Sequence, residues 1–328
     1  MRYVIYGAGA IGCAIGAELA DAGYEVVLIA RGEHLEALRE SGLIYQSRKG
    51  EQRLRISTVA HPDEAEIRDG DRVFLCMKSQ HTLDALRTLC LAAPPSISVI
   101  CAQNGVENER SAQRFFSKVY GLTVRVAAVF VAAGKVENPA YPSAGILDLG
   151  RYPGGIDTEA VSIAQDLSKA GFSSRAVPNI MRWKYAKLLQ NVGTGVQAAF
   201  APSQAREHLL KAVREEAEAC LHAAEVDHAT AEEMSARRKD ILTYDPQADR
   251  KRPGGSTWQS LARKTGSVEV DFLNGEIVLL GRLHGFATPI NEEVQRALWD
   301  TVRCGAGPGR RDAAEVWDRL KKSVGEER

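Results

Sequence analysis

The first half of the chain alternates short apolar runs with amphipathic segments. Four of these runs have the length of a strand, and they lie at residues 3–6, 25–30, 73–77 and 97–102. Strands that alternate with helical segments predict βαβ units, which assemble into a parallel sheet covered by helices. A strand-rich stretch follows at residues 119–133 and 145–149, and a helical pattern at residues 158–170 ends this half.

The second half is patterned almost wholly for helices, with apolar residues recurring at spacings of three and four. The expected helices are residues 180–200, 203–224, 229–243, 256–264 and 268–283, with a last one from residue 291. Pro178-Asn179 separates the two patterns, and a chain of 328 residues exceeds what one hydrophobic core usually fills. We therefore predict an α/β domain with a mostly parallel sheet at residues 1–178 and an all-α domain at residues 179–328.

Two segments of the second half lack a clear period. Residues 245–255 are rich in proline, glycine and charge, which predicts a surface loop, with a lid over a site as the alternative. The tail, residues 305–328, is charged and has glycines near its start. We expect it to form a peripheral helix or to be partly disordered.

Charge and hydropathy narrow the class of protein. Lysine and arginine number 42 and balance 42 aspartates and glutamates, so no net charge would hold a nucleic acid or an anionic membrane. The first residues enter a strand-like run without the charged region and apolar core of a signal peptide, so none is predicted, and no apolar stretch approaches the roughly 20 residues of a spanning helix. We expect a cytoplasmic protein that binds a small molecule, with neither nucleic acid nor membrane as partner. A homodimer stays open.

The six cysteines do not form a recognisable site. They are scattered without a CxxC pair and without histidines at zinc-ligand spacing, so neither a metal site nor a disulfide framework is predicted. Nothing in the sequence pairs any of them with a base, and we expect most of them to be small buried apolar residues.

A glycine-rich turn follows the first predicted strand. Gly7-Ala8-Gly9-Ala10-Ile11-Gly12 matches GxGxxG between a strand and a helix. In this setting Gly7 permits the tight turn, Gly9 lets backbone amides approach a pyrophosphate, and Gly12 lets the helix pack closely on the sheet. The sequence therefore predicts a Rossmann domain that binds a dinucleotide, with a glycine turn that holds no ligand as the alternative.

Arg31 indicates which dinucleotide the domain binds. It follows the second predicted strand, where NAD-binding proteins usually carry an acid for the ribose 2′-hydroxyl. A guanidinium there suits a 2′-phosphate, with which it forms bidentate charge-assisted hydrogen bonds. We therefore favour NADP(H). Glu33, two residues further on, keeps NAD open, and a solvated surface charge is the alternative for Arg31.

Polar residues also follow the third and fourth predicted strands. Lys78 comes after the run at residues 73–77, and Gln103-Asn104-Gly105 comes after the run at residues 97–102. Ligands of open parallel sheets bind beyond the carboxyl ends of the strands, so Lys78 and Asn104 are candidate binding residues. A solvated lysine and an ordinary Asn-Gly turn are the alternatives.

The helix at residues 180–200 carries a polar stripe. Lys184, Lys187, Asn191 and Thr194 recur at spacings of three and four and share one face. Gly193 and Gly195 lie inside the same helix, although each glycine costs up to about 1 kcal/mol relative to alanine. Such glycines usually mark close approach by a ligand or another backbone. A lysine here could neutralise the negative charge that hydride delivery to a ketone develops on oxygen.

As a set, these residues resemble the ketopantoate reductase (2-dehydropantoate 2-reductase) family over nearly the whole chain, up to about residue 297. Several motifs carry the resemblance, and they are Gly7-Ala8-Gly9-Ala10-Ile11-Gly12, Arg31, Lys78, Gln103-Asn104-Gly105, Lys187 with Asn191, Glu269-Val270-Asp271-Phe272-Leu273-Asn274-Gly275, His284-Gly285 and Thr288-Pro289-Ile290-Asn291.

The resemblance implies NADPH-dependent reduction of a 2-oxo acid to a 2-hydroxy acid, with a place in pantothenate biosynthesis and the substrate between the two domains. It makes Lys187 the general acid and lets Glu269 bind a substrate hydroxyl and help to hold that lysine. Asn104 and Asn191 would orient the substrate, with Lys78 close to both cofactor and substrate.

Two departures from the family pattern leave the substrate open. Residues 195–199 read Gly-Val-Gln-Ala-Ala, where members usually have an Asn-Pro-Leu-Thr-Ala-like stretch. Thr257 keeps a hydroxyl where a serine usually binds the substrate carboxylate, with Ser256 as its neighbour. Because such hydrogen bonds set discrimination among similar acids, another hydroxy acid, an opine or an imine stays open as substrate. A non-catalytic protein that senses NADPH is the remaining alternative.

Overall fold

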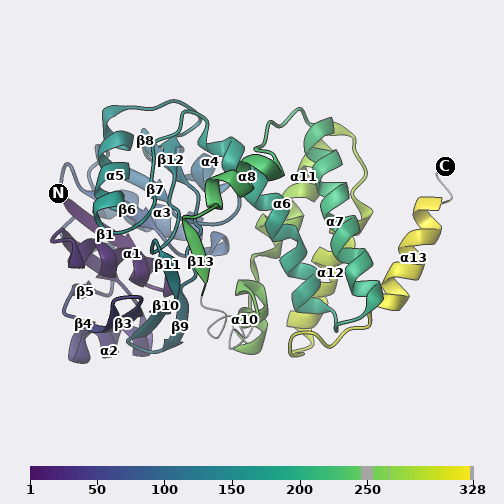
Figure 1. The fold of residues 1–328 in the computed structure, drawn as a ribbon, viewed down its shortest axis with the longest axis horizontal. Coiled ribbons are helices and arrows are strands. Elements are labelled where there is room, and N and C mark those ends of the chain that lie inside the picture. Colours follow the sequence, from purple (N-terminus) through teal and green to yellow (C-terminus); the bar gives the residue numbers. More distant parts are fainter. Residues whose placement is uncertain (245–253, 265, 326–328) are drawn as a thin grey trace. The chain divides into compact units, whose positions relative to one another are not determined.

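The structure, a computed structural model, describes residues 1–244, 254–264 and 266–325, and its residues group into two compact units (Figure 1). The first unit comprises Met1–Lys184 and takes in residues 230–244 as well. The second unit comprises Tyr185–Ala229 and the described residues from 254 onward. The predicted loop at residues 245–255 lies outside the described residues except for its last two positions.

A seven-stranded sheet forms the centre of the first unit, in the order β12-β8-β7-β6-β1-β2-β5. Its strands are β1 (Arg2–Tyr6), β2 (Glu25–Ile29), β5 (Ser57–Val59), β6 (Arg72–Leu75), β7 (Ser98–Cys101), β8 (Lys118–Leu122) and β12 (Leu149–Arg151). All neighbours run parallel except β12, which is antiparallel to β8. The predicted α/β domain with a mostly parallel sheet is confirmed.

Helices cover both faces of this sheet. They are α1 (Ala10–Asp21), α2 (Gly32–Ser41), α3 (Thr82–Ala92), α4 (Asn108–Ala112) and α5 (Thr158–Lys169), with short 3-10 turns η1 (Pro62–Ala65) and η2 (Ser79–His81). Successive side chains of β1 alternate between the faces: Ile5 packs with residues of α1 and α5, whereas Val4 packs with residues of α3 and α4. A strand buried on both faces needs apolar residues throughout, which explains the continuous apolar run.

Two smaller sheets flank the main one. The first has the order β4-β3-β10-β9 and consists of β3 (Leu43–Ser47), β4 (Gly50–Leu54), β9 (Val129–Ala132) and β10 (Lys135–Asn138). The sequence analysis did not predict β3, β4 or β5. Strand β4 has no fully buried residue, so its sequence lacks the apolar run by which the strands of the main sheet were found.

The second small sheet corrects one predicted helix. The segment at residues 229–243 was expected to be a single helix, but α8 (Ala231–Arg238) ends early and the chain continues as β13 (Leu242–Tyr244). Strand β13 pairs antiparallel with β11 (Ala140–Pro142). Between α8 and β13, Asp240 has a φ of 60°, a left-handed conformation that a right-handed helix cannot continue through.

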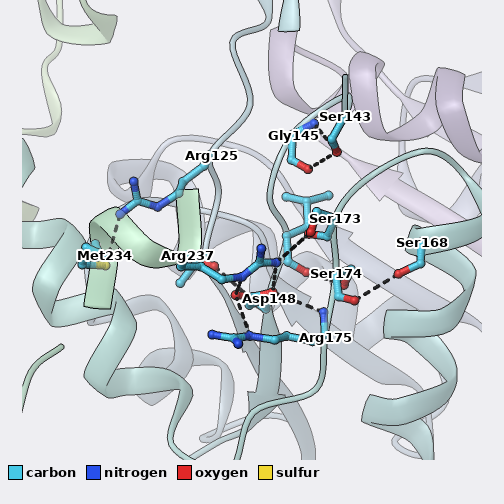
Figure 2. Close-up of polar contacts among 12 residues, drawn as sticks. Arg125, Ser143, Gly145, Asp148, Ser168, Ser173, Ser174, Arg175, Met234 and Arg237 are labelled. Atoms are coloured by element: carbon cyan, nitrogen blue, oxygen red, sulfur yellow. Dashed lines mark hydrogen bonds and ion pairs between the residues drawn. The ribbon is translucent and has the colours of Figure 1, made fainter. Parts of the chain in front are cut away.

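Charged side chains attach α8 to the first unit (Figure 2). Arg237 donates two hydrogen bonds of 2.7 Å to the carboxylate of Asp148, and it also reaches the carbonyl and hydroxyl oxygens of Ser173. At the other end of α8, Arg182 binds Glu233 through two hydrogen bonds of 2.8 Å. A segment distant in sequence is thus joined to the α/β unit by two bidentate pairs.

The second unit is helical, as predicted. Its elements are α6 (Ile180–Ala199), whose first turn belongs to the first unit, and α7 (Gln204–Ala223), α10 (Ser256–Ala262), η3 (Glu269–Phe272), α11 (Asn274–His284), α12 (Pro289–Arg303) and α13 (Ala313–Gly325). The helix expected at residues 268–283 begins only at Asn274, so Glu269 lies in a 3-10 turn. The tail forms α13, which packs against α7.

The glycines inside α6 serve helix packing. A Cβ at Gly193 would lie 3.1–3.2 Å from side-chain atoms of Arg214 and Leu210 on α7. A Cβ at Gly195 would lie 2.8 Å from Val294 on α12 and 2.9 Å from the amide oxygen of Asn274 on α11. The sequence analysis expected a ligand or another backbone to approach these glycines closely. The neighbours are instead side chains of the helices packed against α6.

Candidate cofactor and substrate sites

The three glycines of the turn after β1 occupy different surroundings. Gly7 has a φ of 100°, and a Cβ there would lie 2.7 Å from the Met77 backbone nitrogen. A Cβ at Gly12 would collide with the Gly7 carbonyl oxygen and lie 2.9 Å from the Ile5 side chain. A Cβ at Gly9 would meet nothing within 4 Å. The fold therefore requires Gly7 and Gly12, whereas the space at Gly9 is open.

The N-terminus of α1 fits an anion. Gly9 is the N-cap residue, and no side chain caps the helix. The amides of Ala10, Ile11 and Gly12 lie in the first turn, where an α-helix supplies no acceptors. The amide of Ala8, by contrast, is bonded to the Ile29 carbonyl at 3.0 Å. Open space beside Gly9 and uncapped amides match what a pyrophosphate needs.

Arg31 lies at the carboxyl end of β2, the strand beside β1. It is exposed and precedes α2 as its N-cap residue. Its guanidinium makes no ion pair with any residue that the structure describes, although its charge acts on the Tyr6 hydroxyl: burial raises the pKa of Tyr6 and Arg31 opposes that rise. The charge of Arg31 is thus accessible to an anionic ligand. Glu33, in the first turn of α2, is exposed as well.

The predicted residues after β6 and β7 lie on two loops that hydrogen bonds join. The Gln103 amide donates to the Met77 carbonyl at 2.9 Å and to the Thr82 hydroxyl at 2.7 Å. The Asn104 carbonyl accepts from Asn108 at 3.0 Å and from the Ser79 hydroxyl at 3.3 Å. Lys78 is half-buried at the start of η2. Since β7, β6, β1 and β2 are neighbours, these residues share one edge of the sheet with the glycine turn.

Asn104 also carries an unused acceptor. Its side-chain oxygen is buried and has no hydrogen-bond partner among the described residues. A buried polar atom without a partner costs free energy, so such atoms usually mark a place for a ligand or water. The nicotinamide cofactor and hydroxylated substrates both offer the N–H or O–H donors that this oxygen lacks. The residues present therefore fit a dinucleotide at this edge.

The predicted substrate residues of the second unit lie on three segments that meet at α6. Lys187 and Asn191 are half-buried on α6, and Lys187 makes contacts of its own. Thr257 is buried in the first turn of α10, and Glu269 is buried at the start of η3.

Two contacts bring these segments together. A Cβ at Gly255, the N-cap of α10, would lie 4.0 Å from Thr194 on α6. The Asn274 amide donates to the Val192 carbonyl of α6 at 3.1 Å. The segments that carry Thr257 and Glu269 therefore both approach α6 within one turn of Asn191. These contacts concern the segments, and they place the start of α10 and the start of α11 against α6.

Part of the family-like sequence in this unit is structural. Asn274 and Asn291, fully or almost fully buried, hydrogen-bond to each other at 3.0 Å. Asn291 also donates to Glu216 on α7, which accepts the Ile290 amide as well. This network ties α7, α11 and α12 together, and the sequence analysis had no pattern that would predict the role of Glu216.

Lys184 departs from the predicted polar stripe. Its side chain is only 3% exposed and forms an ion pair with the fully buried Glu109 of α4. The same ammonium donates to the Gln103 carbonyl at 3.0 Å. Burial raises the pKa of the Glu109 carboxyl, and Lys184 opposes that rise. The sequence analysis missed Glu109, because an acid early in a short helix looks like an ordinary surface residue.

Cys13, Cys101 and Cys220 are buried, whereas Cys76 is half-buried and Cys90 and Cys304 are exposed, so half of the six cysteines, and not most of them, are buried. Cys13 lies 3.4 Å from the Nε2 atom of His34, a neighbour that the sequence did not indicate. Burial nevertheless raises the pKa of the Cys13 thiol to about 12, which keeps it protonated. Within residues 1–244, 254–264 and 266–325, no three His, Cys, Asp or Glu side chains are placed to hold a metal ion. No helix in those ranges is long and apolar enough to cross a membrane.

A glycine turn of the dinucleotide-binding type on a mostly parallel sheet, in a chain whose second unit is helical, is typical of a two-unit oxidoreductase. Comparison with family models identifies which one. The ketopantoate reductase family (PanE/ApbA) matches residues 3–153, and the C-terminal part of that family matches residues 179–300. The chain therefore belongs to the ketopantoate reductase family, whose reaction type is oxidoreduction of CH–OH and C=O groups.

Relatives of similar length support this membership. The chain is 29% identical to 2-dehydropantoate 2-reductase of Pyrococcus horikoshii, over 92% of this chain and 97% of that protein. It is also 29% identical to 2-dehydropantoate 2-reductase of Halobacterium salinarum, over 94% of this chain and 100% of that protein.

Solved structures show the same fold. A PanE/ApbA family ketopantoate reductase from Ralstonia eutropha superposes with a TM-score of 0.79 at 28% identity, over 93% of this chain and 99% of that one. A ternary structure of D-mandelate dehydrogenase with NADH and anilino(oxo)acetate superposes with a TM-score of 0.80 at 22% identity, over 93% of this chain and 99% of that one. The latter likeness concerns the fold alone.

Proposed function

We propose that the chain reduces a 2-oxo acid to a 2-hydroxy acid with NADPH, and that 2-dehydropantoate is its substrate. Membership of the ketopantoate reductase family supports the reaction type. The observation that carries the proposal is the glycine turn, in which Gly7 and Gly12 are closed by packing whereas Gly9 faces open space. A turn that served only the fold would have no need for a glycine at Gly9.

The first unit would hold the cofactor. The uncapped amides of Ala10 and Ile11 bind the pyrophosphate at the start of α1. The exposed guanidinium of Arg31 binds the 2′-phosphate and selects NADPH over NADH. Lys78 and Asn104 lie along the same edge and contact the nicotinamide half or the substrate. When bound, NADPH supplies the hydride that reduces the carbonyl carbon.

The second unit would supply the proton. Lys187 is the general acid and protonates the carbonyl oxygen as negative charge develops there. Glu269, a buried carboxyl, binds a substrate hydroxyl and favours the charged form of the lysine. Asn191 and Thr257 bind the polar groups of the acid. Each of these four residues acts on the substrate, whereas the residues of the first unit act mainly on the cofactor.

A substrate panel tests the proposal. The full chain is incubated with NADPH and with 2-dehydropantoate, other 2-oxo acids, and imines, and oxidation of NADPH is followed by absorbance. We expect the highest kcat/KM for 2-dehydropantoate. A higher kcat/KM for another 2-oxo acid would make that acid the substrate, and the proposed reaction type would still hold. Binding of NADPH without turnover of any compound would leave a cofactor-binding protein and overturn the proposal.

Assembly and location are further expectations. One ketopantoate reductase of this fold, from Staphylococcus aureus, is dimeric, and we infer that this chain forms a homodimer as well. Light scattering of the purified protein would measure its mass directly. A cytoplasmic location stays a prediction from the sequence.

A further inference from the structure

An ion pair is buried beside the turn that carries Asn104. Lys184 on α6 is 3% exposed and Glu109 on α4 is fully buried. The ammonium divides its hydrogen bonds between the Glu109 carboxylate and the main-chain carbonyl of Gln103, which lies 3.0 Å away. On strand β8, a Cβ at Gly121 would be in van der Waals contact with this acid, 3.4 Å from Glu109 Oε1.

Stability alone does not explain this pair. Replacing a buried ion pair by apolar residues of similar volume is often neutral or stabilising, because the desolvation of both charges is avoided. The second carboxylate oxygen, Glu109 Oε2, is buried and has no hydrogen-bond partner among the described residues. The interaction that an apolar pair could not provide is the hydrogen bond from Lys184 to the Gln103 carbonyl.

That hydrogen bond fixes one side of Asn104. The Gln103 carbonyl belongs to the peptide group that precedes the Asn104 Cα. The following peptide group is fixed as well, since the Asn104 carbonyl accepts from Asn108 at 3.0 Å and from Ser79 at 3.3 Å. With both flanking peptide planes held, the direction of the Asn104 Cα–Cβ bond is set. The side-chain oxygen has no hydrogen-bond partner of its own among the described residues, so the point from which the side chain extends is set by the backbone.

We propose that Lys184, paired with Glu109, is a positioning residue that aims the Asn104 amide at its ligand. The identity of that ligand rests on the proposed function. The clamp, by which we mean the hydrogen bond from Lys184 that holds the Gln103 carbonyl in the turn at residues 103–105, does not. Lys184 acts through Asn104 and touches neither cofactor nor substrate. This role differs from that of Lys187, which lies one turn further along α6 and donates the proton.

A double-mutant cycle tests the role. The variant Lys184→Met with Glu109→Gln removes the ammonium together with its counter-charge and preserves side-chain volume. Asn104→Ala removes the side chain that is positioned. We expect each to lower kcat/KM for the 2-oxo acid by roughly ten- to a hundredfold, and the triple variant to be no worse than either. The control is Lys211→Met with Glu215→Gln, an exposed pair on α7, which should leave kcat/KM unchanged.

The proposal would be overturned if the two losses in kcat/KM multiplied in the triple variant. It would also be overturned if Lys184→Met with Glu109→Gln kept the full kcat/KM. If that variant does not fold, Lys184→Arg takes its place, since a planar guanidinium cannot reproduce both hydrogen bonds of the ammonium. Lys184→Arg should lower kcat/KM by a smaller factor than the variant without the pair. Combined with Asn104→Ala, it should cause no further loss in kcat/KM.

Hydrogen exchange separates this proposal from the proposed function. Exchange of the amides at residues 103–105 is measured in the full chain, and it should be faster in the Lys184 variants than in the wild type and the control. If the wild type reduces no 2-oxo acid, the proposed function fails and the exchange result alone decides the clamp. Unchanged exchange would then overturn it.

Discussion

Arg237 and Asp148 form a bidentate pair with two hydrogen bonds of 2.7 Å, although they lie 89 residues apart in the chain. The Asp148 side chain is 2% exposed and the Arg237 side chain is 8% exposed. Figure 2 shows the guanidinium extending from α8 to Asp148 and Ser173. Helix α8 follows α6 and α7 in the chain, and through this pair it becomes part of the α/β unit.

Removing Arg237 should destabilise the first unit substantially. Arg237→Met leaves the buried Asp148 carboxylate without its bidentate partner, and breaking a buried pair in this way costs about 3–5 kcal/mol. We expect a value near the lower end, because Arg175 still lies 3.4 Å from the same carboxylate. Urea denaturation of the full chain measures the change. Lys211→Met, which removes an exposed partner of Glu215, should change stability by less than about 0.5 kcal/mol, and an equal effect of the two substitutions would contradict the argument.

Asp166 should make the stability of the first unit depend on pH. Burial alone would raise the pKa of its carboxyl, but hydrogen bonds from Tyr3 at 2.6 Å and Tyr24 at 2.8 Å, together with the charge of Arg72, lower the pKa below its usual value. A carboxyl with a lowered pKa in the folded state stabilises above its unfolded pKa of about 3.9, and the contribution is lost as the pH falls through the folded value.

The difference in unfolding free energy between the wild type and Asp166→Asn should therefore be largest near pH 7 and shrink below about pH 4. Urea titrations at several pH values measure it. Asp84→Asn, at an exposed position paired with Arg87, serves as the control and should show no such trend. A difference that stays constant down to pH 2.5 would mean that Asp166 is not stabilised as an anion.

What the sequence could predict follows from where each segment is buried. Strand β1 lies between two helical layers, so its residues had to be apolar on both faces and the pattern was visible. Strand β13 is three residues long and depends on β11, and no local signal distinguishes it from the end of a helix. The glycine turn was predictable because its spacing lies between a strand and a helix, and the packing at Gly7 and Gly12 leaves no room for a side chain.

The same reasoning explains what could not be predicted at the site. Lys184 lies three residues before Lys187 and seven before Asn191. This helical spacing made it look like another member of the same polar stripe. Its burial depends on Glu109, which is 75 residues away. Partners so distant in sequence are set by tertiary packing, and a single sequence carries no record of them.

Arg31 should govern the choice between the two nicotinamide dinucleotides. Its guanidinium is exposed and has no ion-pair partner among the described residues, so its removal should leave the fold intact. We expect Arg31→Ala to weaken NADPH binding by about one to three kcal/mol, since it removes a charge-assisted bidentate contact, and to leave NADH binding nearly unchanged. Fluorescence titration with each cofactor measures both affinities, and equal losses would show that Arg31 does not read the 2′-phosphate.

Lys187 should affect the reaction and not the binding of the cofactor. As the proposed proton donor it acts in the transition state, so Lys187→Ala should lower kcat by about two to four orders of magnitude. The affinity for NADPH, whose proposed contacts lie in the first unit, should stay the same. Steady-state kinetics and a cofactor titration on the same preparation separate the two effects. An unaltered kcat would remove Lys187 from the mechanism.

Two single-methyl substitutions in the glycine turn should have opposite consequences. A Cβ at Gly9 meets nothing within 4 Å, and its φ of −83° suits any residue, so Gly9→Ala should change the free energy of unfolding by less than about 1 kcal/mol. The methyl group would, however, occupy the space through which a pyrophosphate approaches the amides of α1. We therefore expect cofactor affinity to fall by at least about tenfold with the fold unaffected.

Gly12→Ala is the matched control, because it adds the same methyl group three residues later. There the Cβ meets the Gly7 carbonyl oxygen and lies 2.9 Å from the Ile5 side chain, so overpacking should destabilise the protein by about 1–3 kcal/mol. Thermal unfolding without cofactor and NADPH titration of both variants give the comparison. If Gly9→Ala bound NADPH as the wild type does, the open space at Gly9 would have no role in binding, and the cofactor would have to lie elsewhere on the first unit.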